Sequence, residues 1–436
     1  MRQILLATLL APFLFLTPAS AQAPPQEPAA VTLLRRLLGA EVQFTYDRVT
    51  ATDIAGSALL SGAVLRKGTE VVRITEARLE GLSETGVARL SLRGIAVTGE
   101  LPLTLDRLDL EGLTIRPPAA GQEFLPENVS FDVFRMEGWR SAGDVPVNLG
   151  ALTVEGFGPG RTGQASLTAL EVTTPSMLIA DRLTIARIAY AGFDMNDVLT
   201  AVIAGRAPGR TPGRSSMEIE GVALSQGGAA VARLSALSLR GEILAGRPHI
   251  GSFALRGLEL LPSPLIAGWM QRLGYERLGA DIRLDASHDV AAQILEFSEV
   301  ALELRDVGEL HLAFRADRVP EGMDATNATS ARLVSARLRY VDRSLFQRWL
   351  RTEAVAQGTP ERQMRDTMIQ QAAALLPGAG FAEARAALTR FLRGEATVLE
   401  LAANPRVPMP FSQPTDKPPT NMEGWRNMFG LTLTAR

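Results

Sequence analysis

The chain of 436 residues contains no cysteine. It can therefore have no disulfide framework, no thiolate metal site and no cysteine-linked lipid anchor. Histidine is almost as rare, and no two of His249, His288 and His311 have the i, i+4 spacing of helical metal ligands. These scarcities argue against metal catalysis, and we predict no catalytic residue, no metal ligand and no cofactor.

Aromatic residues make up only 6% of the chain, which argues against a carbohydrate enzyme with an aromatic-lined cleft. The sequence also lacks the G-x-S-x-G, S-x-x-K, H-E-x-x-H, Walker and Rossmann patterns. Carboxylate pairs such as Asp106 with Asp109 and Glu296 with Glu299 are predicted to form cross-strand ion pairs on the solvent side. The segment 194–197 (DMND) lacks the glycine and distal glutamate of a calcium loop, so helix capping by its first residue is expected. We predict that the protein is not an enzyme.

Lysine is scarce as well, since 43 of the 45 basic residues are arginine, a bias typical of a GC-rich bacterial genome. The formal net charge is −2, and both signs are interspersed along the chain. A nucleic-acid partner would need a concentrated basic face, so none is expected.

Only one long hydrophobic run is present, from Ile4 to Leu16, and it is shorter than the roughly 20 residues of a membrane-spanning helix. Arg2 precedes the run, and two A-x-A sites follow it at 19–23. This arrangement is typical of a cleaved secretory signal peptide. We therefore predict a signal peptide over 1–23, cleavage after Ala21 or Ala23, and a periplasmic protein that could still contact a membrane surface.

What the sequence has in abundance is a spaced apolar repeat, clearest in Leu105, Leu108, Leu110 and Leu113, with the pattern h-x-x-h-x-h-x-x-h. Each h-x-h step places two apolar side chains on one face of a strand, and each x-x step shifts the phase by one residue. Further copies or partial copies begin at Ile74, Leu149, Leu167, Ile219, Leu234, Ile250, Phe297 and Leu333.

Glycine often ends the x-x step, as in Glu80-Gly81, Glu111-Gly112, Arg240-Gly241 and Arg256-Gly257. Because glycine tolerates positive φ, these positions predict bulges or turn corners. The repeat starts are irregularly spaced, which favours antiparallel hairpins and meanders over a parallel β-helix. The pattern predicts a mainly β, α+β protein: a large curved antiparallel sheet of repeated short strands, with one apolar and one charged face.

Helices are expected at 31–38, from Asp194 over 195–204, and from Ser263-Pro264 to about Leu273. The tail predicts three more, one begun by Asp342 or Ser344, one by 359–361, and one over 379–392, followed by closing strands at 397–402 and 431–435. The predicted divisions are a first β-repeat region at 24–205, a Pro/Gly/Arg loop at 206–214, a second β-repeat region at 215–340 and a helical segment with closing strands at 341–436.

The runs at 71–99, 103–115, 231–260 and 294–314 resemble the strand repeats of the AsmA-like and YdgA-like envelope proteins of Gram-negative bacteria. The start of the β region at 41–46 and the helical end also resemble uncharacterised exported proteins of alphaproteobacteria. The resemblance implies a long curved sheet with an apolar groove used in envelope lipid handling. It transfers no functional residue, because the pattern specifies core positions only. AsmA-like proteins usually keep an N-terminal membrane anchor, whereas the A-x-A sites here predict release.

Two functions follow as hypotheses. The first is a non-enzymatic periplasmic envelope protein that binds or handles lipid through an apolar sheet face left uncovered. The second is a structural or interaction protein that binds another envelope protein through a sheet edge or through the helical end.

Overall fold

The computed structural model describes residues 27–51, 56–118, 124–173, 180–262, 266–322 and 330–436. The predicted signal peptide and its cleavage sites lie outside these residues, as does the Ser263-Pro264 helix start. The chain divides into two compact units, the first comprising 1–211 and 215–227 and the second 212–214 and 228–436. The predicted loop at 206–214 follows a helix that ends at Ala204, but its last two residues belong to a strand that begins at Gly213.

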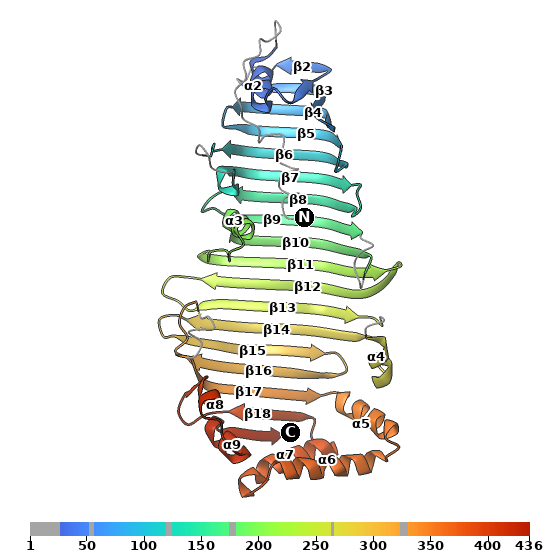
Figure 1. Cartoon of the computed structure of the whole chain (residues 1–436), viewed down its shortest axis with the longest axis vertical. Helices are drawn as coiled ribbons and strands as arrows, with labels where there is room; N and C mark the ends of the chain where they lie inside the picture. Colours follow the sequence, from blue (N-terminus) through green and yellow to red (C-terminus); the bar gives the residue numbers. More distant parts are fainter. Residues whose placement is uncertain (1–26, 52–55, 119–123, 174–179, 263–265, 323–329) are drawn as a thin grey trace. The chain divides into compact units, whose positions relative to one another are not determined.

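The fold is mainly β with several helices, as predicted. The described residues form 20 strands, and every pairing given for them is antiparallel. Within each unit, successive strands in the chain are neighbours for the most part (Figure 1). This is the meander that the irregular repeat spacing favoured.

The first unit contains eleven strands. Its elements are α2 (Ala29–Leu38), β1 (Gln43–Thr45), β2 (Arg48–Ala51), β3 (Ala58–Lys67), β4 (Glu70–Ser83), β5 (Gly86–Thr98), β6 (Leu103–Ile115), η2 (Pro126–Asn128), β7 (Val129–Ser141), β8 (Val147–Phe157), β9 (Thr162–Thr173), β10 (Arg182–Asp194), α3 (Met195–Ala204) and β11 (Gly213–Gln226).

The second unit contains nine strands and most of the helices. Its elements are β12 (Ala229–Ile243), β13 (His249–Leu260), α4 (Ala267–Leu273), β14 (Leu278–Asp289), β15 (Ile294–Leu304), β16 (Gly308–Asp317), β17 (Arg332–Asp342), α5 (Leu345–Ala356), α6 (Glu361–Leu375), η4 (Ala379–Phe381), α7 (Ala382–Arg393), β18 (Val398–Ala403), β19 (Met409–Pro410), α8 (Gln413–Asp416), α9 (Met422–Phe429) and β20 (Leu431–Ala435).

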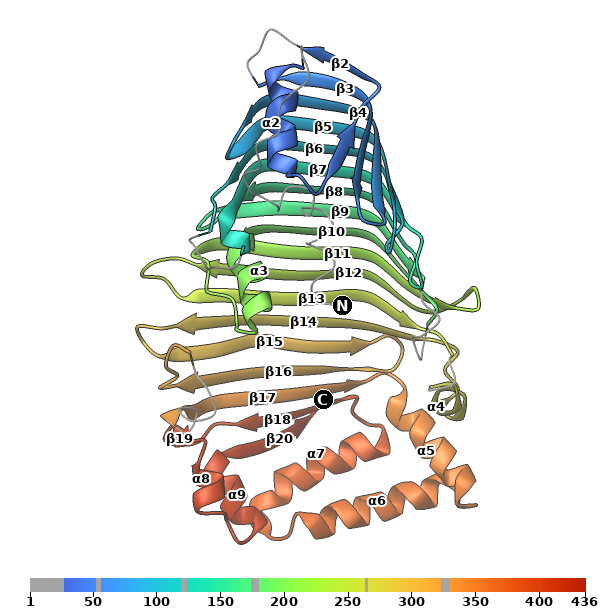
Figure 2. The same cartoon turned by 45° about the horizontal axis from the view of Figure 1, so that its top comes forward.

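The strands are longer than predicted, because an x-x step bends a strand and does not end it. One complete h-x-x-h-x-h-x-x-h copy lies within β6, which has 13 residues. Its two x-x steps form two corners, and Figure 2 shows the strands of the first unit bending on both sides. All four leucines of the copy then point to the inside of the bend. We call this inner apolar face of the first unit the trough.

Glycine forms many of the corners in the first unit. Gly81 has φ +63°, and a Cβ built on it would lie 2.9 Å from the Cβ of Ala88 on the neighbouring strand. A side chain at Gly81 would therefore be strained in its backbone and would also clash. The pairing is Glu80 with Arg89 before the corner and Leu82 with Val87 after it. Each strand contributes one residue between these pairs, so the corner contains no extra residue and is not a bulge.

One predicted corner is wrong. Gly241 is absent from the positive-φ residues, and it pairs with Gly251 inside a continuous register from Leu239 to Glu242. The glycine lies near the end of β12, where the apolar alternation continues without a phase shift.

The trough encloses the largest hydrophobic core of the described residues. Leu105, Leu110 and Leu113 are buried, and Leu108 packs against this core. Helix α2 adds Leu34 and Leu38 to the same cluster. It ends at Gly39, which has φ +78°, and its two arginines lie in the last turn, where they complement the helix dipole. The repeat leucines of β6 therefore contact protein.

The predicted helices are present, with small shifts in their ends. Asp194 caps α3 by accepting the backbone N–H of Asp197 at 3.0 Å. Of the two candidates for the start of α5, Asp342 accepts the N–H of Phe346 at 2.9 Å, whereas the Ser344 side chain makes no capping bond. The closing strands are β18 and β20. Helix α9, at 422–429, was not predicted.

Candidate functional site: an exposed apolar face in the second unit

The second unit has a sheet face on which apolar side chains of neighbouring strands lie opposite one another. The strand register defines two rows, which we call the apolar rows. The central row is Leu239, Phe253, Leu284, Val300, Leu312, Leu338, Leu401 and Leu433. The second row is Leu237, Leu255, Ile282, Leu302, Leu310, Tyr340, Leu399 and Ala435.

Several leucines of the apolar rows are exposed. The exposed fractions are 40% for Leu239, 38% for Leu312 and 38% for Leu401, and Leu310 and Leu338 are similar. Leu312, Leu338 and Leu401 are direct cross-strand neighbours on β16, β17 and β18. Scattered exposed leucines are ordinary on a protein surface, whereas a contiguous row of them marks a binding surface.

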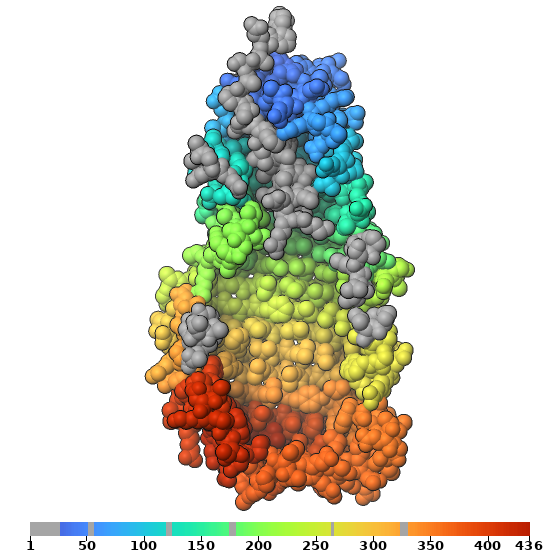
Figure 3. Space-filling view, in the orientation of Figure 1, coloured from blue at the N-terminus to red at the C-terminus, as the bar shows by residue number. Residues whose placement is uncertain are grey.

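Helices flank this face at its margins. Figure 2 shows α4 and α5 along one side of the second unit's sheet, α8 and α9 along the other, and α6 and α7 beyond β20. Phe391 of α7 packs on Tyr340 of the second row, with ring centroids 6.0 Å apart. Met270 and Leu273 of α4 form a separate small core. Figure 3 shows the face hollowed between these helices.

The second row includes one polar contact, at Tyr340. The hydroxyl of Tyr340 donates to Oδ1 of Asp342 at 2.7 Å, and the same carboxylate begins α5. Burial raises the pKa of Tyr340 above its ordinary value, and the hydrogen bond with Asp342 adds to the effect. The phenol is therefore neutral at physiological pH, and the row carries no charge.

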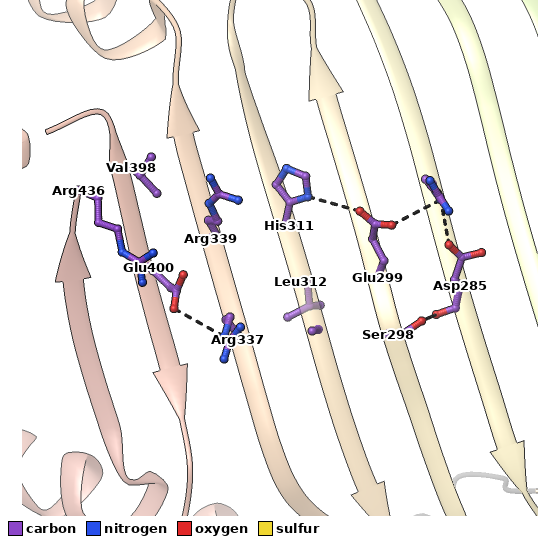
Figure 4. Close-up of a pocket in the computed structure, with 12 residues that line it drawn as sticks. Asp285, Ser298, Glu299, His311, Leu312, Arg337, Arg339, Val398, Glu400 and Arg436 are labelled. Atoms are coloured by element: carbon purple, nitrogen blue, oxygen red, sulfur yellow. Dashed lines mark hydrogen bonds and ion pairs between the residues drawn. The ribbon is translucent and has the colours of Figure 1, made fainter.

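The opposite face of the second unit is charged, because the residues between the apolar positions are arginines and carboxylates. It contains a shallow open depression of about 800 Å³ across β14 to β18, which we call the outer hollow (Figure 4). In it, Nε of Arg283 lies 2.9 Å from Asp285 and 3.4 Å from Glu299. Nε of Arg337 lies 3.6 Å from Glu400.

The three histidines lie on strands of the second unit. His249 and His288 are cross-strand partners with ring centroids 6.3 Å apart, a contact that sequence spacing did not predict. His311 lies on the charged face, with Nε2 3.2 Å from Glu309. Among the residues that the structure describes, no three His, Asp or Glu side chains are grouped so as to hold a metal ion.

The carboxylates singled out in the sequence are mostly in ion pairs. Asp106 accepts hydrogen bonds from both terminal nitrogens of Arg140 at 3.1 Å. Asp109 accepts a hydrogen bond from the hydroxyl of Ser91 at 2.6 Å. Glu299 contacts Arg283, as described above. The predicted cross-strand ion pairs are confirmed for Asp106 and Glu299, whereas Asp109 forms its ion pair with Arg107 on its own strand. Glu296 is the register partner of Arg315.

Comparisons with known proteins cover only part of the chain. A family model described as "Uncharacterized protein" matches residues 301–436, which extend from β15 to β20 and include much of the apolar rows and of the outer hollow. No curated protein matches the chain. None of the helices in the described part of the chain is both long and apolar enough to cross a membrane.

Proposed function

We propose that the chain is a non-enzymatic periplasmic envelope protein that binds the acyl chains of lipids on the apolar rows of the second unit. The observation that carries the proposal is the exposed row Leu312, Leu338 and Leu401. Removing such a row from water is favourable by about 25 cal/mol per Å² of apolar area. An acyl chain can cover the row because it is apolar and has no group that needs a hydrogen-bond partner. The resemblance to AsmA-like envelope proteins belongs to this proposal.

The dimensions support an acyl ligand. The central row crosses eight strands from β12 to β20. Leu433 at the β20 end packs against the core formed with α7, so at about 4.8 Å per strand the part of the row from Leu239 to Leu401 is roughly 29 Å long. Half of a bilayer's hydrocarbon core is about 15 Å thick, so an extended acyl chain fits along the row.

A binding experiment with a fluorescent fatty acid tests the site. We expect Leu312→Glu to weaken binding by about tenfold or more, because it places a charge in the apolar row. The matched control is Thr434→Glu, which places the same charge at an exposed position of β20. Circular dichroism confirms that both variants fold. Equal affinity of Leu312→Glu and the unaltered protein would contradict the site.

Lipid extraction tests the function. Protein purified from its native envelope should yield lipid by mass spectrometry, and cell fractionation should place it in the periplasm with an N-terminus after Ala21 or Ala23. An extract without lipid, together with no fatty-acid binding, would reject the proposal.

The alternative is an interaction protein that binds another envelope protein through the helical end. Val355 on α5 and Leu375 on α6 favour it, with exposed fractions of 78% and 71%. Both edges of the strand series are short, since β1 has three residues and β20 has five, which is a common way to discourage pairing with other sheets. Periplasmic cross-linking that gives one dominant protein partner and no lipid would favour this alternative.

A further inference from the structure

Three arginines surround one carboxylate at one end of the outer hollow (Figure 4). Arg339 on β17 lies directly opposite Glu400 on β18, and Arg337 lies two residues along the same strand. The backbone of Arg436 exchanges hydrogen bonds with Val398 at 2.9 and 3.0 Å, so it lies beside β18 two residues from Glu400. Residues two apart on a strand share a face, and these four side chains line the same hollow.

The negative charges of the hollow already have partners. Arg283 contacts both Asp285 and Glu299, and Arg337 contacts Glu400. The guanidinium groups of Arg339 and Arg436 have no ion pair or hydrogen bond within the part of the chain that the structure describes. At this end three arginines face the single carboxylate of Glu400, whereas the whole hollow has four arginines and three carboxylates and so a net charge of +1.

We infer that this end of the outer hollow binds a phosphate group. A guanidinium presents parallel N–H donors that match phosphate oxygens in a bidentate manner. A phosphate monoester carries about −1.5 to −2 charges near pH 7, so its oxygens attract the guanidinium groups of Arg339 and Arg436. The exposed Thr434, opposite Glu400 on β20, adds a hydroxyl donor to the same face. This site lies on the face opposite the apolar rows and does not depend on lipid binding there.

Glu400 opposes the anion. Its carboxylate lies opposite Arg339 in the register and 3.6 Å from Nε of Arg337, and it would repel a bound phosphate. Neutralising it should therefore tighten binding, which a residue that only supports the fold would not do.

The test is calorimetric titration of the purified chain with inorganic phosphate and with glycerol 3-phosphate. We expect Arg339→Gln and Arg436→Gln each to weaken binding by about tenfold, Glu400→Gln to tighten it, and added salt to weaken it. The matched control is Arg187→Gln, which removes an arginine that faces Glu220 at 3.7 Å in the first unit and should leave affinity unchanged. Each variant is checked by thermal unfolding.

Vesicles distinguish a headgroup from a free phosphate. Flotation with phosphatidic acid vesicles is compared with flotation with phosphatidylcholine vesicles. If the protein floats with phosphatidic acid and Arg339→Gln abolishes this flotation, the ligand is a lipid phosphate. If the protein binds glycerol 3-phosphate but does not float, the ligand is a soluble phosphate ester. No binding of either probe, or equal loss in Arg339→Gln and Arg187→Gln, overturns the inference. The fatty-acid assay tests the apolar rows on the other face. If no fatty acid binds there, the phosphate titrations still test the outer hollow on their own.

Discussion

The two units bend their strands in different ways. In the first unit, the pairings from β3 with β4 to β8 with β9 keep one register from end to end, because corners on neighbouring strands coincide. In the second unit, every pairing from β13 with β14 to β16 with β17 has a register shift. Strand β14 alternates without an x-x step, whereas β13 and β15 have one. A phase step on only one of two neighbours requires a bulge, so the patterns of adjacent strands together decide whether a corner or a bulge forms.

The difference extends to what the apolar side chains contact. Coincident corners bend the first unit into a trough, where Leu79 and Leu90 are only 3% and 2% exposed. The second unit presents leucines of the same kind on a flatter sheet, and its described helices pack at the margins, with α7 against Tyr340, Leu399 and Leu433. A repeat of one type therefore produces a core in one unit and an exposed face in the other, according to how strongly its strands bend.

The largest expected effect separates a trough leucine from an exposed one. Leu79→Ala should lower the free energy of unfolding by about 3 kcal/mol, because it removes a buried side chain and leaves a cavity. Leu312→Ala should change it by less than about 0.5 kcal/mol. Urea unfolding followed by hydrogen-exchange mass spectrometry assigns each change to its unit.

If Leu312→Ala lowered the free energy of unfolding by more than about 2 kcal/mol, the apolar rows would be a buried core. The contrast between the two units would then be wrong. The same result would also count against acyl-chain binding there, because the row would then be covered by protein.

A smaller effect is expected at the corners. Gly81→Ala should cost about 2 kcal/mol, because alanine would adopt positive φ and meet Ala88 at 2.9 Å. The matched substitution is Gly251→Ala in β13, where a Cβ meets nothing within 4 Å. This substitution should raise the free energy of unfolding by about 0.5 kcal/mol, because alanine lowers the conformational entropy of the unfolded chain. The measurement is thermal unfolding of both variants, and equal signs would reject the corner model.

The smallest effect concerns pH in the second unit. Hydrogen bonding to Arg343 and then to His311 lowers the pKa of Glu309 below its ordinary 4.5. A lowered pKa in the folded state contributes stability above pH 4.5 that is lost as the pH falls through the folded value. Glu309→Gln should therefore cost less than about 1 kcal/mol at pH 6, and this cost should shrink towards pH 3.5. A cost independent of pH would show that the carboxylate charge contributes nothing.

Much of the fold follows from the sequence because its signals are local. The spacing of Leu105 to Leu113 identified a strand, its two phase steps and its inward face, and the caps of α2 and α3 set their ends. Copies in β5, β7 and β10 were missed, and in the last two aromatic residues fill some of the positions: Val87, Leu90, Leu92 and Ile95 in β5, Phe131, Phe134, Met136 and Trp139 in β7, and Ile185, Ile188, Tyr190 and Phe193 in β10. Helix α9 was missed because it follows a proline-rich segment.

The candidate site could be predicted only in kind. Apolar alternation predicted an apolar sheet face, but whether Leu312 is covered depends on where α5 to α9 pack, and no local pattern encodes that packing. The arginines around Glu400 come from positions 337, 339 and 436, which are brought together by the pairing of β17, β18 and β20. Long-range pairing also explains the missed neighbours His249 and His288.

Constant register across the corners makes the hairpins between β3 and β9 interchangeable with one another. A hairpin inserted by gene duplication would meet its neighbours with the corners already aligned, so no other strand would need to change. Each such insertion would lengthen the trough by about 10 Å, at roughly 4.8 Å per strand, while its cross-section stayed the same. Relatives of this chain should therefore differ in length by whole hairpins in this part of the sequence.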